Sequence, residues 1–327
     1  MTEGKKVVID CDPGIDDCFA LLLCMKHLDV AGIVAVGGNT DLQYTERNAR
    51  LITELAGRPE IPVYAGYNLP LGRKVVRATD VHGNSGLGDV FVQEPVKQLE
   101  SRHGVDYLID TFMNRDDVTL ITLGPMTNVA QALLKEPRLA TRIPGILSMA
   151  GSAFVGNDTA VAEFNISGDP EAAQIVLQSG IPIRMVGLNV LRQNRFTEKE
   201  VEQIRQCGGP VAEFAAELLS FAIRRYGYSN LCDASAVSWM IDPSIITNSV
   251  NVHMDVETKG ELTRGMTVCD WRAFLSAAPK EDLAHERQIS HEEMGVKEGA
   301  LNVELAMEMD SERMKQLLLD TIRSYGK

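Results

Sequence analysis

The chain has 327 residues, of which 45% are hydrophobic and 24% charged, so it can bury a large core in one or at most two domains. Its formal net charge is -13 at pH 7, whereas proteins that neutralise nucleic-acid phosphates carry the opposite sign, so we expect no nucleic-acid partner. No run reaches the roughly 18 consecutive apolar residues of a membrane span. We therefore predict a soluble, cytoplasmic protein whose six cysteines, which lack CxxC spacing, are free thiols.

Short apolar strands alternate with helical patterns along the chain. Strands are predicted at residues 5–11, 30–38, 61–66, 118–124, 143–151 and 181–190, and helices at residues 16–28, 45–57, 105–115, 126–134 and 169–179. Residues 195–241 are predicted to be helical, followed by strands at 248–258 and 265–271 and an amphipathic helix at 304–322. Continuous Val, Ile and Leu strands separated by helices indicate an α/β fold with an open, mostly parallel, Rossmann-like sheet flanked by helices. No linker or repeat interrupts the pattern, so residues 1–327 are expected to form a single domain.

Polar residues follow nearly every predicted strand. Asp10, Asp12, Asp16 and Asp17 stand at the end of the first strand. The second, fourth, fifth and sixth strands are followed by "GGNT", "LGPMTN", "AGSAFVGNDTAVAEFN" and "GLN". Because open parallel sheets bind their ligands at the carboxyl ends of the strands, we predict the functional site at this edge.

The four aspartates admit two interpretations. The motif "DPGIDD" is typical of a turn, and Asp16 and Asp17 would suit the amino end of the next helix. Capping needs only one or two carboxylates, however, and a divalent cation would relieve the repulsion among four. The cluster offers only oxygen ligands, which indicates Ca²⁺ or Mg²⁺, and Leu21 in place of the bidentate Glu excludes an EF-hand. Further ligands could be backbone carbonyls of "TLGPMTN" and Asp233, which could also be a plain helix N-cap.

Six motifs in this order carry a family resemblance. They are "DCDPGIDDCFAL", "VGGNT", "VHGNSGLG", "LGPMTNVA", "GNDTAVAEFNISGDPEAA" and "LCDASAV". Over residues 5–270 the chain resembles the inosine-uridine preferring nucleoside hydrolase family, and the aspartate motif combined with "AEFN" and "DPEAA" is highly specific. The resemblance implies an open α/β sheet with Ca²⁺ at the carboxyl ends of its strands. It further implies hydrolysis of the N-glycosidic bond of ribonucleosides to ribose and free base, a homodimer or homotetramer, and a role in purine and pyrimidine salvage.

The resemblance also implies the metal-binding and catalytic residues. Asp12 would be both a Ca²⁺ ligand and the general base that acts on a calcium-bound water. Asp17, Asp233 and the backbone carbonyl of Leu123, where the family usually has Thr, would complete the protein ligands, with Asp10 supporting them from behind. Since calcium acidifies water far less than zinc does, a carboxylate has to accept the proton.

The substrate contacts are implied in the same way. They are Asp16 and Asn165 for the ribose 2′ and 3′ hydroxyls, Asn157 and Glu163 for the 5′ hydroxyl, Asn39 for the nucleophilic water, and His82 facing the substrate. Taken singly, Asn157 could belong to a loop turn, Glu163 could cap a helix, and His82 could be a solvated loop residue. Base recognition is expected from loops near residues 66–90 and 220–232, where Tyr228 could stack on a base or simply pack.

Cys232 departs from the usual family pattern. Many members have His at this position, proposed to protonate the departing base, and members with Cys form a subgroup with the same class of reaction. A thiol with an ordinary pKa of about 8.5 is mostly protonated at pH 7 but is a weaker hydrogen-bond donor than imidazole. Three alternatives stay open: Cys232 is the acid, Cys232 only packs, or the proton comes from Tyr226, Tyr228, His82 or solvent.

Two other functions are alternatives. A phosphatase of the haloacid dehalogenase type would use Asp10 as its nucleophile, but "DPGIDD" is not the usual continuation of that motif, and amide and carboxylate groups suit hydroxyls better than phosphate. A non-enzymatic ribose-binding or nucleoside-binding protein would share the sugar contacts without needing a base and a water. The sequence does not indicate which nucleosides are preferred. It also does not distinguish a dimer from a tetramer.

Overall fold

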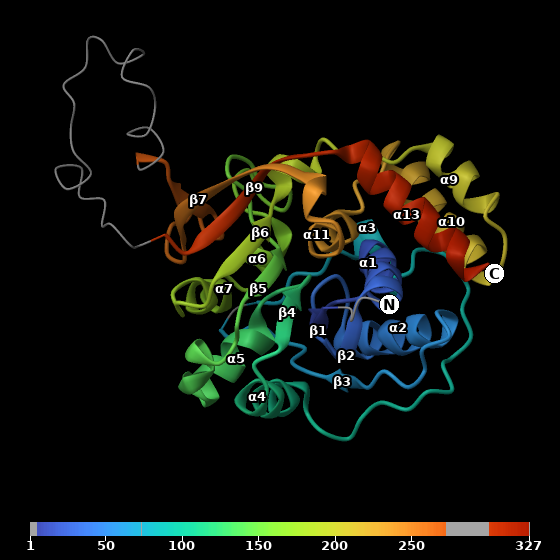
Figure 1. Ribbon diagram of the computed structural model, residues 1–327. Helices are drawn as coiled ribbons and strands as arrows, with labels where there is room; N and C mark the ends of the chain where they lie inside the picture. The colour runs from blue at the N-terminus through green and yellow to red at the C-terminus, as the bar shows by residue number, and fades with distance from the viewer. Residues whose placement is uncertain (1–4, 73, 273–300, 327) are drawn as a thin grey trace, which may run out of the picture.

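The computed structural model describes residues 5–72, 74–272 and 301–326 and shows an open α/β sheet with helices on both faces (Figure 1). Within these residues the sheet has nine strands in the order β3-β2-β1-β4-β5-β6-β9-β7-β8. The strands are β1 (Lys6–Cys11), β2 (Asp29–Ala35), β3 (Val63–Ala65), β4 (Val118–Thr122), β5 (Ile146–Met149), β6 (Ile183–Val186), β7 (Ile246–Val256), β8 (Thr267–Asp270) and β9 (Val303–Met309). Strands β1 to β6 and β9 are parallel, whereas β7 runs antiparallel to both β9 and β8.

Helices connect most of these strands. The α-helices are α1 (Ile15–His27), α2 (Leu42–Leu55), α3 (Thr79–His82), α4 (Gly104–Asn114), α5 (Thr127–Lys135), α6 (Phe164–Gly168), α7 (Pro170–Leu177), α8 (Leu188–Leu191), α9 (Glu198–Arg205), α10 (Pro210–Tyr226), α11 (Cys232–Ile241) and α13 (Ser311–Tyr325). Two short 3₁₀ helices, η1 (Pro137–Thr141) and η2 (Pro243–Ile245), follow α5 and α11. The predicted α/β fold with a mostly parallel sheet is confirmed.

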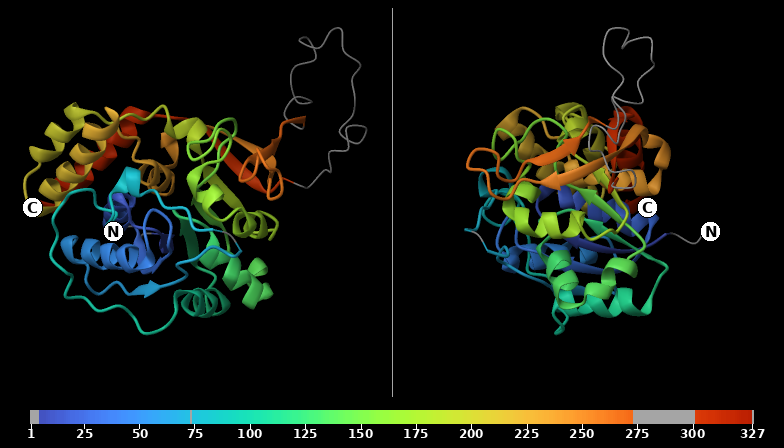
Figure 2. Two further views of the ribbon diagram at one scale, coloured as in Figure 1. Left: turned by 180° about the vertical axis from the view of Figure 1, so that it is seen from behind. Right: turned by 90° about the vertical axis from the view of Figure 1, so that its left-hand side faces the viewer.

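Side chains of β1 alternate between two hydrophobic cores. Val7 and Ile9 belong to the core that contains residues of α1, α2, α10, α11 and α13, whereas Val8 belongs to the core with residues of α4, α5 and α7. Figures 1 and 2 show these two groups of helices on opposite sides of the sheet. Helix α1 is buried along ten of its thirteen residues because α2, α10, α11 and α13 all pack against it. Its nearly uniform apolar sequence is therefore explained by burial on several sides.

The order in which strands are added to the sheet reverses at β1. Strands β2 and β3 lie on one side of β1, while β4, β5 and β6 lie on the other. The backbone N–H of Leu123, just after β4, donates to the carbonyl of Asp10 at 2.8 Å, so the ends of β1 and β4 meet. A reversal of this kind opens a crevice beyond the carboxyl ends of the strands, where open α/β sheets hold their ligands. The aspartate cluster lies at this crevice.

Several predicted elements differ from the structure. A short helix, α3, lies within the expected polar loop, and α8 replaces the end of the strand expected at residues 181–190. The largest error is the helix predicted at 304–322, because residues 303–309 form strand β9 and α13 begins only at Ser311. Pairing with β6 and β7, and burial of Leu305 and Ala306, outweigh the helix propensity of this Glu, Leu, Ala and Met segment. The carboxylate of Asp310 accepts from the Arg313 N–H at 3.0 Å and caps α13.

The cysteines are packed as single residues. All six are free thiols, as predicted, and Cys11, Cys18 and Cys24 are fully enclosed in the core around α1. Among the described helices, none is long and apolar enough to cross a membrane.

Candidate active site

The turn between β1 and α1 is closed by a carboxylate. Asp17 accepts hydrogen bonds from the backbone N–H groups of Asp12 at 3.2 Å and Gly14 at 3.0 Å. Both donors are otherwise unpaired at the start of a helix, so Asp17 does cap α1, as one interpretation of the motif held. Capping accounts for Asp17 alone, so the positions of Asp10, Asp12 and Asp16 need another explanation.

Asn39, after β2, joins the same cluster. Its backbone N–H donates to Oδ2 of Asp12 at 2.7 Å, and its side-chain amide donates to the Asp12 carbonyl and to Oδ2 of Asp17, both at 3.1 Å. Glycines enclose the Asp12 carboxylate on two sides, because a Cβ added at Gly38 or Gly124 would collide with it. Sequence reasoning missed these two glycines, although both stand in the polar motifs after β2 and β4.

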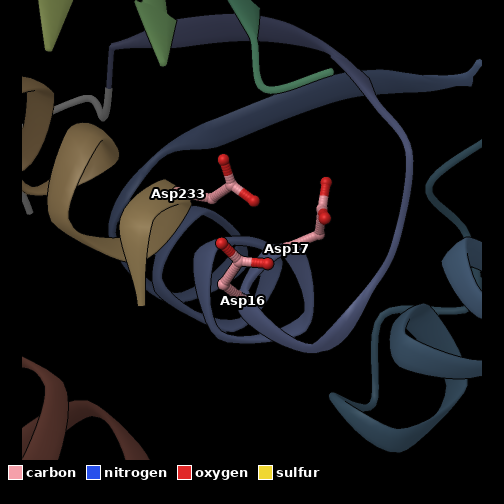
Figure 3. Close-up of side chains that lie close together, drawn as sticks. All are labelled: Asp16, Asp17 and Asp233. Atoms are coloured by element: carbon pink, nitrogen blue, oxygen red, sulfur yellow. The ribbon is translucent and has the colours of Figure 1, made fainter. Parts of the chain in front are cut away.

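Three carboxylates gather at the floor of the crevice. One oxygen each of Asp16, Asp17 and Asp233 lies within 4.8 Å of the others, so these residues could hold a metal ion. Figure 3 shows the three carboxylates facing a common space, with Asp16 and Asp17 from α1 and Asp233 from the first turn of α11. This trio contains Asp16 where the resemblance implied Asp12. The Asp12 carboxylate is fully buried beside Asp17.

Burial makes the charged forms of Asp12, Asp17 and Asp233 costly. It raises the pKa of Asp12 and of Asp233 well above the ordinary range, with nearby Asp17 and Asp16, respectively, adding to the effect. Burial and then Asp16 raise the pKa of Asp17 to about 7. Oδ1 of Asp12, of Asp16 and of Asp233 is buried without a hydrogen-bond partner among the described residues. A cation fits this set, because it would bind the oxygens and favour the ionised carboxylates.

Asp10 is a fully buried carboxylate near the end of β1. Burial raises its pKa to about 8, and the side-chain amide of Asn128 donates to it at 2.8 Å. The Asn128 side-chain oxygen accepts from the backbone N–H of Tyr67 at 2.7 Å. Asn128 therefore ties Asp10 to the loop after β3, a role that sequence reasoning missed although Asn128 ends the quoted "LGPMTN" motif.

A cavity of about 310 Å³ opens over these residues. Nine predicted site residues line it: Asp16, Asn39, His82, Leu123, Asn157, Glu163, Asn165, Cys232 and Asp233. Lining residues that the prediction missed are Arg77, Ala78, Asp80, Val81, Met149, Asp158 and Phe164. A larger cavity of about 480 Å³ lies among the amino ends of β4, β5 and β6, but its described lining has no comparable group of carboxylates. We therefore place the candidate active site in the cavity at the carboxyl ends of the strands.

One wall of the cavity is the loop after β5 together with α6. The carboxylate of Glu163 caps α6 by accepting from the N–H groups of Asn165 and Ile166, and it also accepts from the N–H of Gly151 at 2.9 Å. Burial raises the pKa of Glu163 to about 7. The Asn165 amide donates to the carbonyl of Leu123 at 2.7 Å, and Oδ1 of Asn157 accepts from the Phe164 N–H at 2.9 Å. Glu163 therefore both caps α6 and lines the cavity.

His82 also lines the cavity. The interpretation of His82 as a solvated loop residue is wrong, because the side chain is buried at the end of α3. Its Nδ1 accepts the backbone N–H of Ile15 at 3.0 Å, which places the ring proton of a neutral imidazole on Nε2. Burial lowers the pKa of His82, so the ring is neutral at pH 7. His82 therefore offers an N–H donor at the cavity.

Cys232 and Asp233 begin α11 after a strained residue. Leu231 has φ of 41°, the one positive φ outside glycine in the described chain, and its carbonyl accepts from the N–H and hydroxyl of Ser235, both at 3.0 Å. Asp233 is the second residue of α11, so it is not the N-cap. Burial raises the pKa of Cys232 well above the ordinary value, which keeps the thiol protonated. The structure does not bring Tyr228 to the cavity lining; Arg195 lies over its ring, 4.5 Å from the centroid.

The comparison with protein families agrees with the fold and the carboxylate cluster. A sequence model of the inosine-uridine preferring nucleoside hydrolases matches residues 7–316. The chain belongs to this family. It is therefore a ribonucleoside N-glycosidase, as the sequence predicted, and the phosphatase alternative is not supported.

Individual nucleoside hydrolases resemble the chain over most of its length. It is 34% identical to the inosine-uridine preferring nucleoside hydrolase of Crithidia fasciculata, covering 98% of both chains. It is 40% identical to the pyrimidine-specific ribonucleoside hydrolase RihA of Salmonella enteritidis, covering 84% of this chain and 91% of that one. The solved structure of a purine-preferring ribonucleoside hydrolase from Gardnerella vaginalis matches with a TM-score of 0.87 at 30% identity, covering 99% of each chain. Because the three names state different preferences, similarity alone does not assign the base.

Proposed function

We propose that this nucleoside hydrolase is calcium-dependent and uses Asp12 as its general base. The observation that carries the proposal is the group of carboxylates at the cavity, in which one buried oxygen each of Asp12, Asp16 and Asp233 has no partner in the described chain. Asp12, Asp17 and Asp233 with the Leu123 carbonyl would hold the ion. The all-oxygen donor set favours a hard cation, and Ca²⁺ accepts six to eight oxygens in flexible geometry. When bound, it would supply the positive charge that holds sugar hydroxyls and water together.

The sugar contacts are proposed in the lining of the same cavity. Asp16 and Asn165 would bind the 2′ and 3′ hydroxyls of ribose, and Asn157 and Glu163 the 5′ hydroxyl. Support comes from their shared position in the cavity wall and from the bonds that hold them in place. The Asn165 amide donates to two backbone carbonyls, and Glu163 accepts three backbone N–H groups, so both side chains are held before substrate binds.

The hydrolytic step is proposed to begin at Asp12. Asp12 would accept a proton from the water that attacks C1′ of the ribose, and Asn39, whose amide is fixed by Asp12 and Asp17, would position that water. Cleavage gives the sugar oxocarbenium character. The surrounding carboxylates stabilise this developing positive charge.

We expect Cys232→Ala to lower kcat on a good substrate by less than about tenfold, because a thiol whose pKa is raised by burial is a poor proton donor. The measurement is ribose release at saturating Ca²⁺, with Ca²⁺ affinity measured on the same preparation. A loss of about a thousandfold with unchanged affinity would contradict the packing role and make Cys232 the acid.

The proposed function is tested by measuring ribose release from inosine, adenosine, guanosine, uridine and cytidine, with and without a chelator. Turnover that disappears on chelation and returns with Ca²⁺ supports the proposal. Binding of nucleosides without release of ribose would instead indicate a ribose-binding protein, and full turnover after chelation would rule out the metal. The five substrates also decide whether purines, pyrimidines or both are accepted.

We further propose a cytoplasmic homodimer or homotetramer that serves nucleoside salvage. Support comes from the six free thiols, which suit a reducing compartment, and from the oligomers typical of the family. Light scattering of the purified protein distinguishes the two assemblies.

A further inference from the structure

Arg77 is an unexpected cation in the wall of the cavity. It precedes α3, and among the described residues that line the cavity it is the one Lys or Arg. The carboxylates in the same lining belong to Asp16, Asp80, Asp158, Glu163 and Asp233. Arg77 thus adds one positive charge to a cavity whose other charged side chains are acidic.

The guanidinium of Arg77 is held in a fixed orientation. Its Nε and Nη2 donate to Oδ1 of Asp41 at 3.1 and 3.0 Å, and Nη2 also lies 2.8 Å from both the carbonyl and Oδ1 of Asn68. The next residue, Ala78, donates its N–H to the carbonyl of Asn39 at 3.1 Å, which ties this segment to the aspartate cluster. The remaining nitrogen, Nη1, has no partner in the described chain. The side chain is 15% exposed, and its hydrogen bonds to Asp41 and Asn68 orient this donor before any ligand binds.

The proposed ribose contacts leave one part of the cavity for the base. Asp16 with the wall from Asn157 to Asn165 would hold the sugar. The remaining lining comprises Asn39, Leu123 and Asp233, which the proposed metal and water sites use, together with the segment 77–82, Met149 and Cys232. A base attached to a ribose held in this way is left with the part of the lining that contains Arg77.

We propose that Nη1 of Arg77 donates a hydrogen bond to the departing base and stabilises the negative charge it acquires. This inference rests on the proposed function of the same site. The C1′–N bond breaks with its electron pair passing to the base nitrogen, while the oxygen of water bonds to C1′ and its proton passes to Asp12. The base anion then takes a proton from solvent, and Asp12 returns its own to solvent. A guanidinium suits this task because it stays charged at every working pH.

The proposed role of Arg77 should matter more for substrates whose leaving group is a poor one. A nucleoside base leaves as an unstable anion, whereas the p-nitrophenolate of p-nitrophenyl β-D-ribofuranoside spreads its own charge and needs little help. We expect Arg77→Met to lower kcat/KM for inosine and uridine by about 100-fold, as loss of one oriented donor does. The same variant should lower kcat/KM for the p-nitrophenyl riboside by less than about threefold. Arg77→Lys, which keeps the charge, should recover part of the nucleoside activity.

A matched control is Arg50→Met. Arg50 is 14% exposed and paired with Glu46, but it lies on α2 away from the cavity lining, so its loss should affect both substrates equally. Equal losses on both substrates for Arg77→Met, or no loss, would overturn the proposal and leave Arg77 a structural partner of Asp41. If that variant is insoluble, Arg77→Gln tests the same difference. A wild-type protein that releases no ribose from any nucleoside refutes the proposed function instead.

Discussion

Asp12→Asn is expected to lower kcat/KM for ribose release by about 1000-fold at saturating Ca²⁺, because the isosteric amide cannot accept the proton of water. Asn keeps an oxygen to accept the Asn39 N–H that now donates to Oδ2 of Asp12 at 2.7 Å, so the fold should be retained. The measurement is steady-state ribose release over a range of Ca²⁺ concentrations. Raising the Ca²⁺ concentration should not restore this variant.

Asp17→Asn provides the comparison that separates the two roles of the cluster. Its neutral amide weakens the cation site, so activity should fall at low Ca²⁺ and rise as Ca²⁺ is added. Asp29→Asn, on the exposed carboxylate that pairs with Lys6, should leave activity unchanged. If Asp12→Asn kept more than about a tenth of wild-type activity at saturating Ca²⁺, another group would have to be the base.

Removal of the cation is expected to make the stability of the protein fall as pH rises. Burial raises the pKa values of Asp12, Asp17 and Asp233 in the folded state, that of Asp17 to about 7, whereas unfolded aspartates titrate near pH 3.9. Between these values the folded protein binds more protons than the unfolded chain, so its free energy of unfolding decreases with pH. Bound Ca²⁺ favours the ionised carboxylates and should offset this loss.

The difference in melting temperature between the Ca²⁺-loaded and chelated protein should therefore be larger near pH 8 than near pH 5.5, by about 3 °C or more. Thermal unfolding in matched buffers measures it. Asp233→Asn removes one of the buried carboxylates and should flatten the pH dependence of the chelated protein. A difference that is the same at both pH values, or larger at the acidic one, would contradict a cation site built from these residues.

Much of the fold was predictable because it depends on local pattern. The strand at residues 5–11 and the helix after Asp16 follow from continuous apolar runs, and both are confirmed. The helix predicted at 304–322 failed because its first residues pair with β6 and β7, and a single sequence does not show pairing with distant strands.

The carboxylate cluster was predictable for a similar reason. Asp12, Asp16 and Asp17 are neighbours in the chain, so their chemistry is visible in one short motif. Arg77 was not predictable, because its meaning depends on Asp41, on Asn68 and on the cavity that it lines. The same holds for Asn128, which reaches Asp10 across 118 residues of sequence.

The sequence by itself thus determined the α/β class, the family, and the acidic motif at the end of the first strand, since these depend on residue order and short-range spacing. Only the tertiary structure decided that an oxygen of Asp16 meets those of Asp17 and Asp233, the last brought from α11. It also decided the protonated nitrogen of His82 and placed Arg77 in the same cavity lining as the carboxylates. These features depend on hydrogen bonds and burial between segments far apart in the chain, which form only when the sheet assembles.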